Sequence, residues 1–277
     1  MSGRVARATE MSRRALLWAA PGLALGAIAA EGACGPPDAQ PHPLPPRSRA
    51  PAQAVRHALA PGKAPTRSPL PVQSRPVRTL AQYRSLVPGP AFPAHAVALT
   101  IDDGPNPEWT PAILRLLDKY HIPATFFMIG VEARGHAAVA RTVAAAGHNI
   151  ANHTWSHPLS LPKQTPDQMR QQIQRTQDTI HSTTGRVPSL FRSPGGDWSA
   201  PLLARTAEAG LVPIDWSDDP RDWSRPGTGQ IVSRMLAAKP GQILLCHDGG
   251  GDRSQTYQAL NTVIPGLLGR GYTFVSL

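Results

Sequence analysis

The chain has 277 residues and a formal net charge of +10 at pH 7, and its length suits one large α/β domain or two small ones. The charge does not indicate a nucleic-acid partner, because it is concentrated near the N-terminus. Residues 1–95 hold 12 Lys and Arg against 3 Asp and Glu, whereas residues 96–277 hold 16 against 15.

Residues 1–33 are predicted to be an export signal, with Met11 as an alternative start. Arg13 and Arg14 precede a mostly apolar stretch, as in a twin-arginine signal. The usual aromatic residue is missing after them, so a Sec signal stays open. The apolar stretch is short for a bilayer span and is interrupted by Pro21, so we expect no stable membrane span.

Residues 34–94 are predicted to be a largely disordered linker. They are rich in Pro, Ala and Arg and contain few large apolar residues with which to bury a core. Cys34 opens the alternative of a lipid anchor, but Glu31 stands where a lipoprotein signal carries an aliphatic residue. Cleavage and export are therefore favoured, and the protein is expected outside the cell or at the cell wall.

From about residue 96 onward, short β-rich runs alternate with helical patterns. The predicted strands are 96–101, 124–129, 148–152, 189–192, 211–215, 242–246 and 272–277. Between the first two, Ile113, Leu116, Leu117 and Tyr120 fall at the spacing of one helix face. Seven strands alternating with helices predict a parallel sheet, open or closed into a barrel. In either form, functional residues gather at the carboxyl ends of the strands.

Polar clusters follow five of these predicted strands. They are the pair Asp102–Asp103, HTWSH (153–157), FRSPGGDW (191–198), DWSDDPRDW (215–223) and LLCHD (244–248). A fold without a site at this edge would scatter such clusters, so their common position indicates one functional site.

His153 and His157 form an H-x-x-x-H pattern, which on its own is also common on exposed helices. In a tight loop after a strand, however, two converging imidazoles would bind a transition metal, and an aspartate would complete an open catalytic site. Neighbouring residues at a strand end point in different directions. One member of the Asp102–Asp103 pair can therefore ligate the metal while the other accepts a proton from an attacking water.

Taken in order, the five clusters resemble the motifs of the polysaccharide deacetylase domain, the NodB-type domain of carbohydrate esterase family four, over residues 95–277. The resemblance implies a distorted (β/α)7 barrel. It also implies a metal-dependent hydrolase that removes acetyl groups from sugars, mostly N-acetyl groups.

The resemblance further implies roles for the first two clusters. TIDDGP matches Asp102 to the catalytic base and Asp103 to a metal ligand, and HTWSH matches His153 and His157 to the two remaining protein ligands. The cofactor is then one divalent metal ion. Two imidazoles and a carboxylate suit zinc best, with cobalt, nickel and manganese as alternatives.

In the third cluster, Arg192 resembles the arginine that orients the base, and the backbone N–H of Gly195 is matched to the oxyanion donor. Two departures from the family pattern occur. Gly195 stands where an aromatic residue is usual, which affects the shape of the sugar site, and Ile101 replaces a common Phe. Trp198, near the arginine, is the best candidate among the tryptophans for stacking on a sugar ring.

The last two clusters complete the implied set. Asp222 resembles the acid that hydrogen-bonds the catalytic histidine, and Trp223 resembles a wall of the pocket. Leu245 matches the contact to the acetyl methyl group, and His247 matches the general acid. Strand alternation places Leu245 and His247 on one face and Cys246 on the other.

The expected partner is an acetylated glycan, either peptidoglycan or a chitin-like N-acetylglucosamine polymer, and a monomer is expected. Two alternatives stay open from the sequence: an O-acetyl esterase acting on an acetylxylan-type glycan, and a non-catalytic glycan-binding protein of the cell wall on the same fold.

Overall fold

The computed structural model describes residues 62–277. The export signal, the lipidation of Cys34 and the first part of the linker lie outside the described residues, so these stay predictions. No helix in the described part of the chain is long and apolar enough to cross a membrane.

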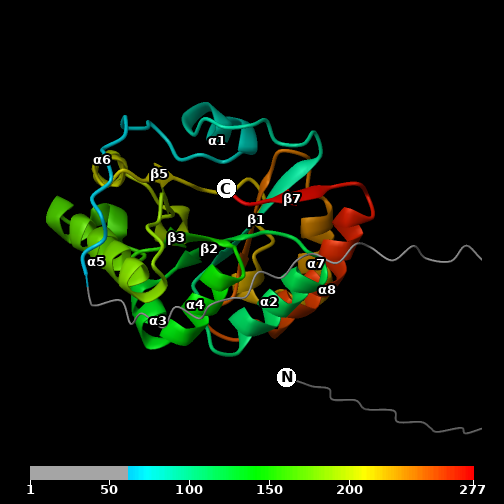
Figure 1. The fold of residues 1–277 in the computed structure, drawn as a ribbon. Coiled ribbons are helices and arrows are strands. Elements are labelled where there is room, and N and C mark those ends of the chain that lie inside the picture. Colours follow the sequence, from blue (N-terminus) through cyan, green and yellow to red (C-terminus); the bar gives the residue numbers. More distant parts are fainter. Residues whose placement is uncertain (1–61) are drawn as a thin grey trace, which may run out of the picture. The chain divides into compact units, whose positions relative to one another are not determined.

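Seven parallel strands form one curled sheet, as the sequence predicts (Figure 1). They are β1 (Ala96–Asp102), β2 (Thr125–Met128), β3 (Asn149–Asn152), β4 (Leu190–Phe191), β5 (Val212–Pro213), β6 (Ile243–His247) and β7 (Thr273–Val275). The order is β5-β4-β3-β2-β1-β6, and β7 pairs with the first half of β1. All strands run the same way, so their carboxyl ends meet at one rim.

Helices cover the outer face of this sheet (Figure 1). The helices after β1 are α2 (Trp109–Lys119), α3 (Gly130–Gly135), α4 (Ala137–Ala145), α5 (Pro166–Thr184), α6 (Ala200–Glu208), α7 (Thr228–Leu236) and α8 (Ser254–Leu268), with short 3₁₀ turns η1 (Leu161–Lys163), η2 (Pro194–Gly196) and η3 (Asp222–Ser224). The longest, α5, has a complete capping box between Thr165 and Gln168 and ends at Gly185 in the left-handed conformation. These signals fix where α5 begins and ends.

The two faces of β1 have different roles. Leu99 and Ile101 point outward and pack in the main core between the sheet and the helices, together with Cys246 of β6. Thr100 and Asp102 alternate with them and point into the barrel, where both are buried. Ile101 therefore faces away from Asp102. The presence of Ile where the family pattern commonly has Phe thus alters packing in the core and not the side chains of the site.

Residues 62–94 differ from the expected disordered linker. They contain a helix, α1 (Leu80–Leu86), which Thr79 caps, and Leu80 and Tyr83 are buried against the inner face of the sheet. Val77 forms a parallel bridge to Ile214 after β5. Thr79 forms an antiparallel bridge to Gln242, just before β6, so this segment lies between the two edges of the sheet, β5 and β6.

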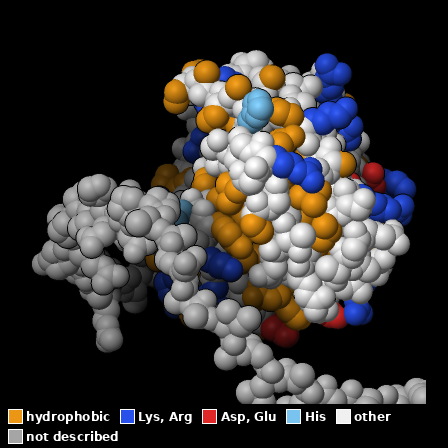
Figure 2. All heavy atoms as spheres, turned by 90° about the vertical axis from the view of Figure 1, so that its right-hand side faces the viewer, with side chains coloured by type: hydrophobic (Ala, Val, Ile, Leu, Met, Phe, Trp, Pro, Cys, Tyr) orange, Lys and Arg blue, Asp and Glu red, His pale blue; other side chains and the backbone are white. Residues whose placement is uncertain are grey.

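The surface charge agrees with the balanced composition of residues 96–277. Figure 2 shows the side of the molecule that carries α7 and α8, where Lys and Arg side chains lie in separate groups among uncharged ones. Binding to a nucleic-acid backbone requires a continuous stripe of basic side chains. The separate groups on this face do not form such a stripe.

Candidate active site and metal centre

The predicted metal ligands follow β1 and β3, the two strands on either side of β2 in the sheet. Asp103 follows the last residue of β1, His153 follows β3, and His157 lies one turn further along. One donor atom from each of the three lies within 4.8 Å of the other two. The Nε2 atoms of His153 and His157 are 3.4 and 3.3 Å from Oδ1 of Asp103. The chain thus brings together the Asp-His-His set that its sequence predicts.

This set fits a divalent metal ion. Oδ1 of Asp103 is buried and has no hydrogen-bond partner in the described part of the chain, an arrangement that is costly for a carboxylate without a cation. The Nδ1 atom of His153 lies 2.9 Å from the carbonyl oxygen of Arg192. A proton on Nδ1 in that contact leaves Nε2 unprotonated, with its lone pair free to ligate a metal, as metal-ligating histidines require.

The protonation states suit metal binding as well. Burial raises the pKa of Asp103, but the close approach of the His153 imidazole and the nearby His247 and His157 outweigh burial and hold that pKa below its usual range. Burial, reinforced by His153, lowers the pKa of His157 below its ordinary value. At neutral pH the site therefore presents an ionised carboxylate and a neutral imidazole, which are the forms that ligate metals.

Asp102 is held by Arg192, which is fully buried in the barrel. Arg192 donates from Nη1 to Oδ1 of Asp102 at 2.6 Å and to the hydroxyl of Thr100 at 3.0 Å. Its guanidinium plane lies over the ring of Phe127, with Cζ 4.0 Å from the centroid. The second oxygen of Asp102 faces His153, 3.7 Å from Nε2. One carboxylate oxygen is thus fixed and the other faces the metal set.

His247 is held by Asp222. Its Nδ1 lies 2.8 Å from Oδ1 of Asp222, and its backbone N–H donates to Oδ2 of the same carboxylate at 2.9 Å. Thr256 donates a third hydrogen bond to Asp222. Burial disfavours the imidazolium, but the carboxylate of Asp222, assisted by the paired aspartates, raises the pKa of His247 to about 9. The imidazole is therefore protonated at neutral pH and can donate a proton from Nε2.

The turn that carries the paired aspartates packs tightly against the end of β6. The backbone N–H of Asp248 donates to the carbonyl of Asp102 at 3.0 Å. A Cβ on Gly104 would collide with the Asp248 carboxylate, and a Cβ on Gly249 would collide with the backbone of Asp103. Glycine is required at both positions because the two turns approach so closely. This packing fixes Asp103, whose φ of 74° is uncommon for a non-glycine residue.

The remaining predicted residues fall into two groups. Gly195, Trp223 and Leu245 follow or lie in strands that end at the same rim; Gly195 is exposed, Trp223 is 48% exposed and Leu245 is buried. Trp198 is placed differently from the expectation. It packs edge-on against Phe191 and lines a surface pocket formed with residues 72–76. Its position is explained by this packing, and we assign it no contact with substrate.

Sequence reasoning missed one pair that supports the site. Arg78 donates from Nε and Nη2 to Oδ2 of Asp215 at 3.0 and 2.9 Å, and the carbonyl of Asp215 accepts from Arg192 at 3.1 Å. The segment before β1 therefore contacts the residue that holds the guanidinium. Only the three-dimensional structure shows this pairing, because the two residues are 137 positions apart.

Comparisons with known proteins agree with the geometry of the site. Residues 90–214 match the family described as polysaccharide deacetylase. A chitooligosaccharide deacetylase of Rhizobium leguminosarum bv. trifolii is 42% identical over 193 residues, which cover 65% of this chain and 89% of the relative. The chain belongs to the polysaccharide deacetylase family.

Solved structures in this family share the fold. The crystal structure of a peptidoglycan N-acetylglucosamine deacetylase is 35% identical, with a TM-score of 0.64, over 66% of this chain and 86% of that chain. A pseudoenzyme of carbohydrate esterase family four from Bacillus anthracis is 29% identical, with a TM-score of 0.62, over 66% of this chain and 64% of that chain. The distorted barrel expected from the sequence is therefore confirmed.

Proposed function

We propose that this polysaccharide deacetylase is a metal-dependent hydrolase that removes N-acetyl groups from N-acetylglucosamine units of a glycan. The observation that carries the proposal is the buried, unpartnered Oδ1 of Asp103 facing two imidazole nitrogens. Beside it lie a fixed carboxylate, Asp102, and a protonated imidazole, His247. A metal set, a base and an acid at one rim of the sheet are what amide hydrolysis needs.

In the proposed reaction, water attacks the acetyl carbonyl carbon and the C–N bond breaks. A divalent ion held by Asp103, His153 and His157 would polarise the carbonyl and lower the pKa of the water. Asp102 accepts the proton of the attacking water on the oxygen that Arg192 leaves free. Acetate is one product, and the sugar amine is the other.

The remaining residues act on the two ends of the breaking bond. The backbone N–H of Gly195 donates to the developing oxyanion, a contribution of the kind that accounts for ~10²–10³ in rate in other hydrolases. His247 gives its Nε2 proton to the departing nitrogen, while Asp222 holds the ring through Nδ1. Leu245 supplies an apolar contact for the acetyl methyl group, and the half-exposed Trp223 borders the sugar site.

The choice between N-acetyl and O-acetyl substrates is tested by measuring acetate release. The proposal expects acetate from N-acetylglucosamine oligomers and peptidoglycan at a much higher rate than from acetylxylan, with Zn²⁺ supplied. Faster release from acetylxylan would favour the O-acetyl esterase. The names of the relatives, a chitooligosaccharide deacetylase and a peptidoglycan N-acetylglucosamine deacetylase, favour the first outcome.

A non-catalytic glycan-binding protein is the second candidate, because a family pseudoenzyme shares this fold. Against it stands the complete set of side chains in this chain: Asp102 with its arginine, His247 with its carboxylate, and the three candidate ligands. Binding of glycan without acetate release, with metal supplied, would establish this candidate.

Asp222→Asn is expected to move the basic limb of the kcat profile to lower pH. Since His247 acts in its protonated form, activity is retained below its pKa of about 9 and lost as the pH rises through that value. Removing an opposite charge in direct contact typically shifts a pKa by ~1–3 units. The measurement is kcat against pH on an N-acetylglucosamine oligomer. Asp219→Asn, a charge removal in the same loop, is the control and should leave this limb in place.

Leu159→Ala is expected to raise KM for an N-acetylglucosamine oligomer roughly 3- to 10-fold with little change in kcat. The reason is that each methylene group that substrate would bury contributes ~0.8 kcal/mol to binding, and the variant loses part of this contact. Leu159 is 65% exposed, and its Cδ2 lies 3.5 Å from where a Gly195 side chain would begin. It therefore occupies the rim that Gly195 leaves open. Leu86→Ala, at an exposed leucine on α1, is the control. Equal KM values for the two variants would exclude a substrate contact at Leu159.

The export of the protein and its place at the cell wall stay predictions that rest on residues 1–33. A glycan of the cell wall is accessible to the enzyme only after export, so the two proposals support each other. Detection of the folded enzyme in the culture medium or on the wall would test export directly.

A further inference from the structure

The loop between the two candidate histidine ligands, residues 154–156, has an unusual backbone. Thr154 and His157 have φ values of 69° and 55°, in the left-handed region that few non-glycine residues occupy. Such conformations persist only where neighbouring groups fix them. Because His153 and His157 must converge on Asp103, the groups that fix this loop also fix the metal set.

Most contacts of the loop come from its own segment or from the residues after β2. The N–H of Thr154 donates within the segment, to Oδ1 of Asn152 at 2.9 Å. The N–H of His157 donates to the hydroxyl of Thr154 at 3.0 Å. The N–H groups of residues 130 and 131 donate to the carbonyls of residues 154 and 155. The N–H groups of Trp155 and Ser156 have a different partner.

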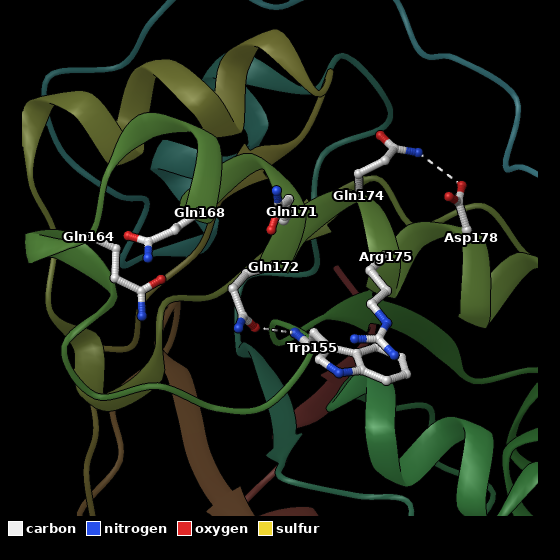
Figure 3. A pocket seen from close by; sticks show the side chains of 8 residues that line it. All are labelled: Trp155, Gln164, Gln168, Gln171, Gln172, Gln174, Arg175 and Asp178. Atoms are coloured by element: carbon white, nitrogen blue, oxygen red, sulfur yellow. Dashed lines mark hydrogen bonds between the residues drawn. The ribbon is translucent and has the colours of Figure 1, made fainter.

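Both of these N–H groups are bound by one side chain of α5. Oε1 of Gln172 accepts from the N–H of Trp155 at 2.8 Å and from the N–H of Ser156 at 3.0 Å. Nε2 of Gln172 donates to the hydroxyl of Ser156 at 3.0 Å. Figure 3 shows the Gln172 amide directed at Trp155, whereas Gln168 and Gln171, on the same helix, point elsewhere in the pocket.

The helix is rigid enough to act as a support. Met169 and Ile173, on either side of Gln172, are buried in a core cluster, and the helix start is fixed by its capping box. Arg175, one turn further along, lies with Cζ 3.6 Å from the Trp155 ring centroid and holds the indole against the helix (Figure 3). The loop is therefore held from α5 at its backbone and at its central side chain.

We propose that Gln172 is a positioning residue of the metal centre. An amide oxygen has two lone pairs and can accept both N–H groups, while the amide nitrogen donates to the serine. These three hydrogen bonds hold residues 154–156 in the conformation that aims His153 and His157 at Asp103. The inference rests on the proposed metal site and assigns Gln172 no contact with substrate.

The test is Zn²⁺ affinity, measured on metal-free protein by competition with a chromogenic chelator. Gln172→Met, which keeps the length of the side chain and removes its polar atoms, is expected to weaken Zn²⁺ binding about 10- to 100-fold, the usual cost of losing an outer support of a ligand. Gln172→Glu keeps two acceptor sites and is expected to retain affinity close to wild type. Ser156→Ala removes one of the three bonds and should give a smaller loss.

Gln171→Ala and Gln174→Ala are the matched controls, because both residues line the same pocket and neither bonds the loop. The Co²⁺-substituted proteins give a second readout, since the visible spectrum of Co²⁺ reports its ligand geometry and should change in Gln172→Met but not in the two control variants. Equal Zn²⁺ affinity for Gln172→Met and Gln171→Ala would overturn the inference. Failure of the wild-type protein to bind Zn²⁺ would instead overturn the proposed metal site.

Discussion

Asp102→Asn is expected to lower kcat by at least ~10²–10⁴, the usual contribution of a general base, while metal content stays at the wild-type level. Asparagine has nearly the same shape as aspartate and keeps an oxygen for Arg192, but it cannot accept a proton at neutral pH. The three candidate ligands are untouched by the change. The measurement combines acetate release at saturating substrate with metal analysis of the same preparation.

Asp197→Asn is a suitable control for this variant, since it removes one carboxylate from an exposed loop beyond the arginine. Loss of metal from the Asp102→Asn protein would mean that the roles of the paired aspartates are reversed. Unchanged turnover would mean that a group other than Asp102 accepts the proton of the attacking water, and the role assigned to Asp102 would then be wrong.

Asp103→Asn is expected to lose the metal and, with it, turnover, by ~10³-fold or more, since removing one electrostatic element alone costs ~10²–10³. The neutral amide of asparagine binds a divalent ion much more weakly than the carboxylate that lies between the two imidazoles. Metal per chain and acetate release should fall together. Adding excess Zn²⁺ should restore part of the activity, as it should not for Asp102→Asn.

The comparison of these two variants distinguishes an effect on folding from the separate roles of the two aspartates in metal binding and proton transfer. Both remove one negative charge from neighbouring positions, so a general effect of charge on folding would appear in both. If Asp103→Asn keeps its metal, the ligand set inferred from the Asp-His-His geometry is wrong.

Much of the site could be predicted from the sequence because strand alternation is a local rule. Ile101 and Asp102 must face opposite sides of β1, and Cys246 and His247 must face opposite sides of β6. The structure agrees, since Ile101 and Cys246 both pack in the core between the sheet and the helices. The clusters follow strands of one parallel sheet, so their convergence needed no knowledge of side-chain packing.

The supports of the site could not be predicted in the same way. Arg78 meets Asp215 across 137 positions, and Gln172 reaches the loop before its own helix. Neither contact follows from spacing along the chain, since each depends on how a helix or segment lies over the sheet. The contact of Trp198 is also one that spacing did not predict, because its ring packs edge-on against Phe191.

Helix α1 had a local signal that the composition concealed. Thr79 is a favourable N-cap, and Leu80 and Tyr83 are three positions apart on one helix face. The Pro-rich residues around them favoured a linker, yet the two apolar side chains are buried in a core cluster with residues of the inner face of the sheet. Tertiary packing here decides the conformation of a short segment.

The central claim, metal-dependent N-deacetylation, is tested most directly by one measurement on the wild-type protein. Acetate and new primary amine are followed together on an N-acetylglucosamine oligomer, before and after treatment with a chelator and after addition of Zn²⁺. We expect equal amounts of acetate and amine, loss of both on chelation, and recovery with Zn²⁺. Absence of acetate from the oligomer, from peptidoglycan and from acetylxylan, with metal supplied, would contradict the account.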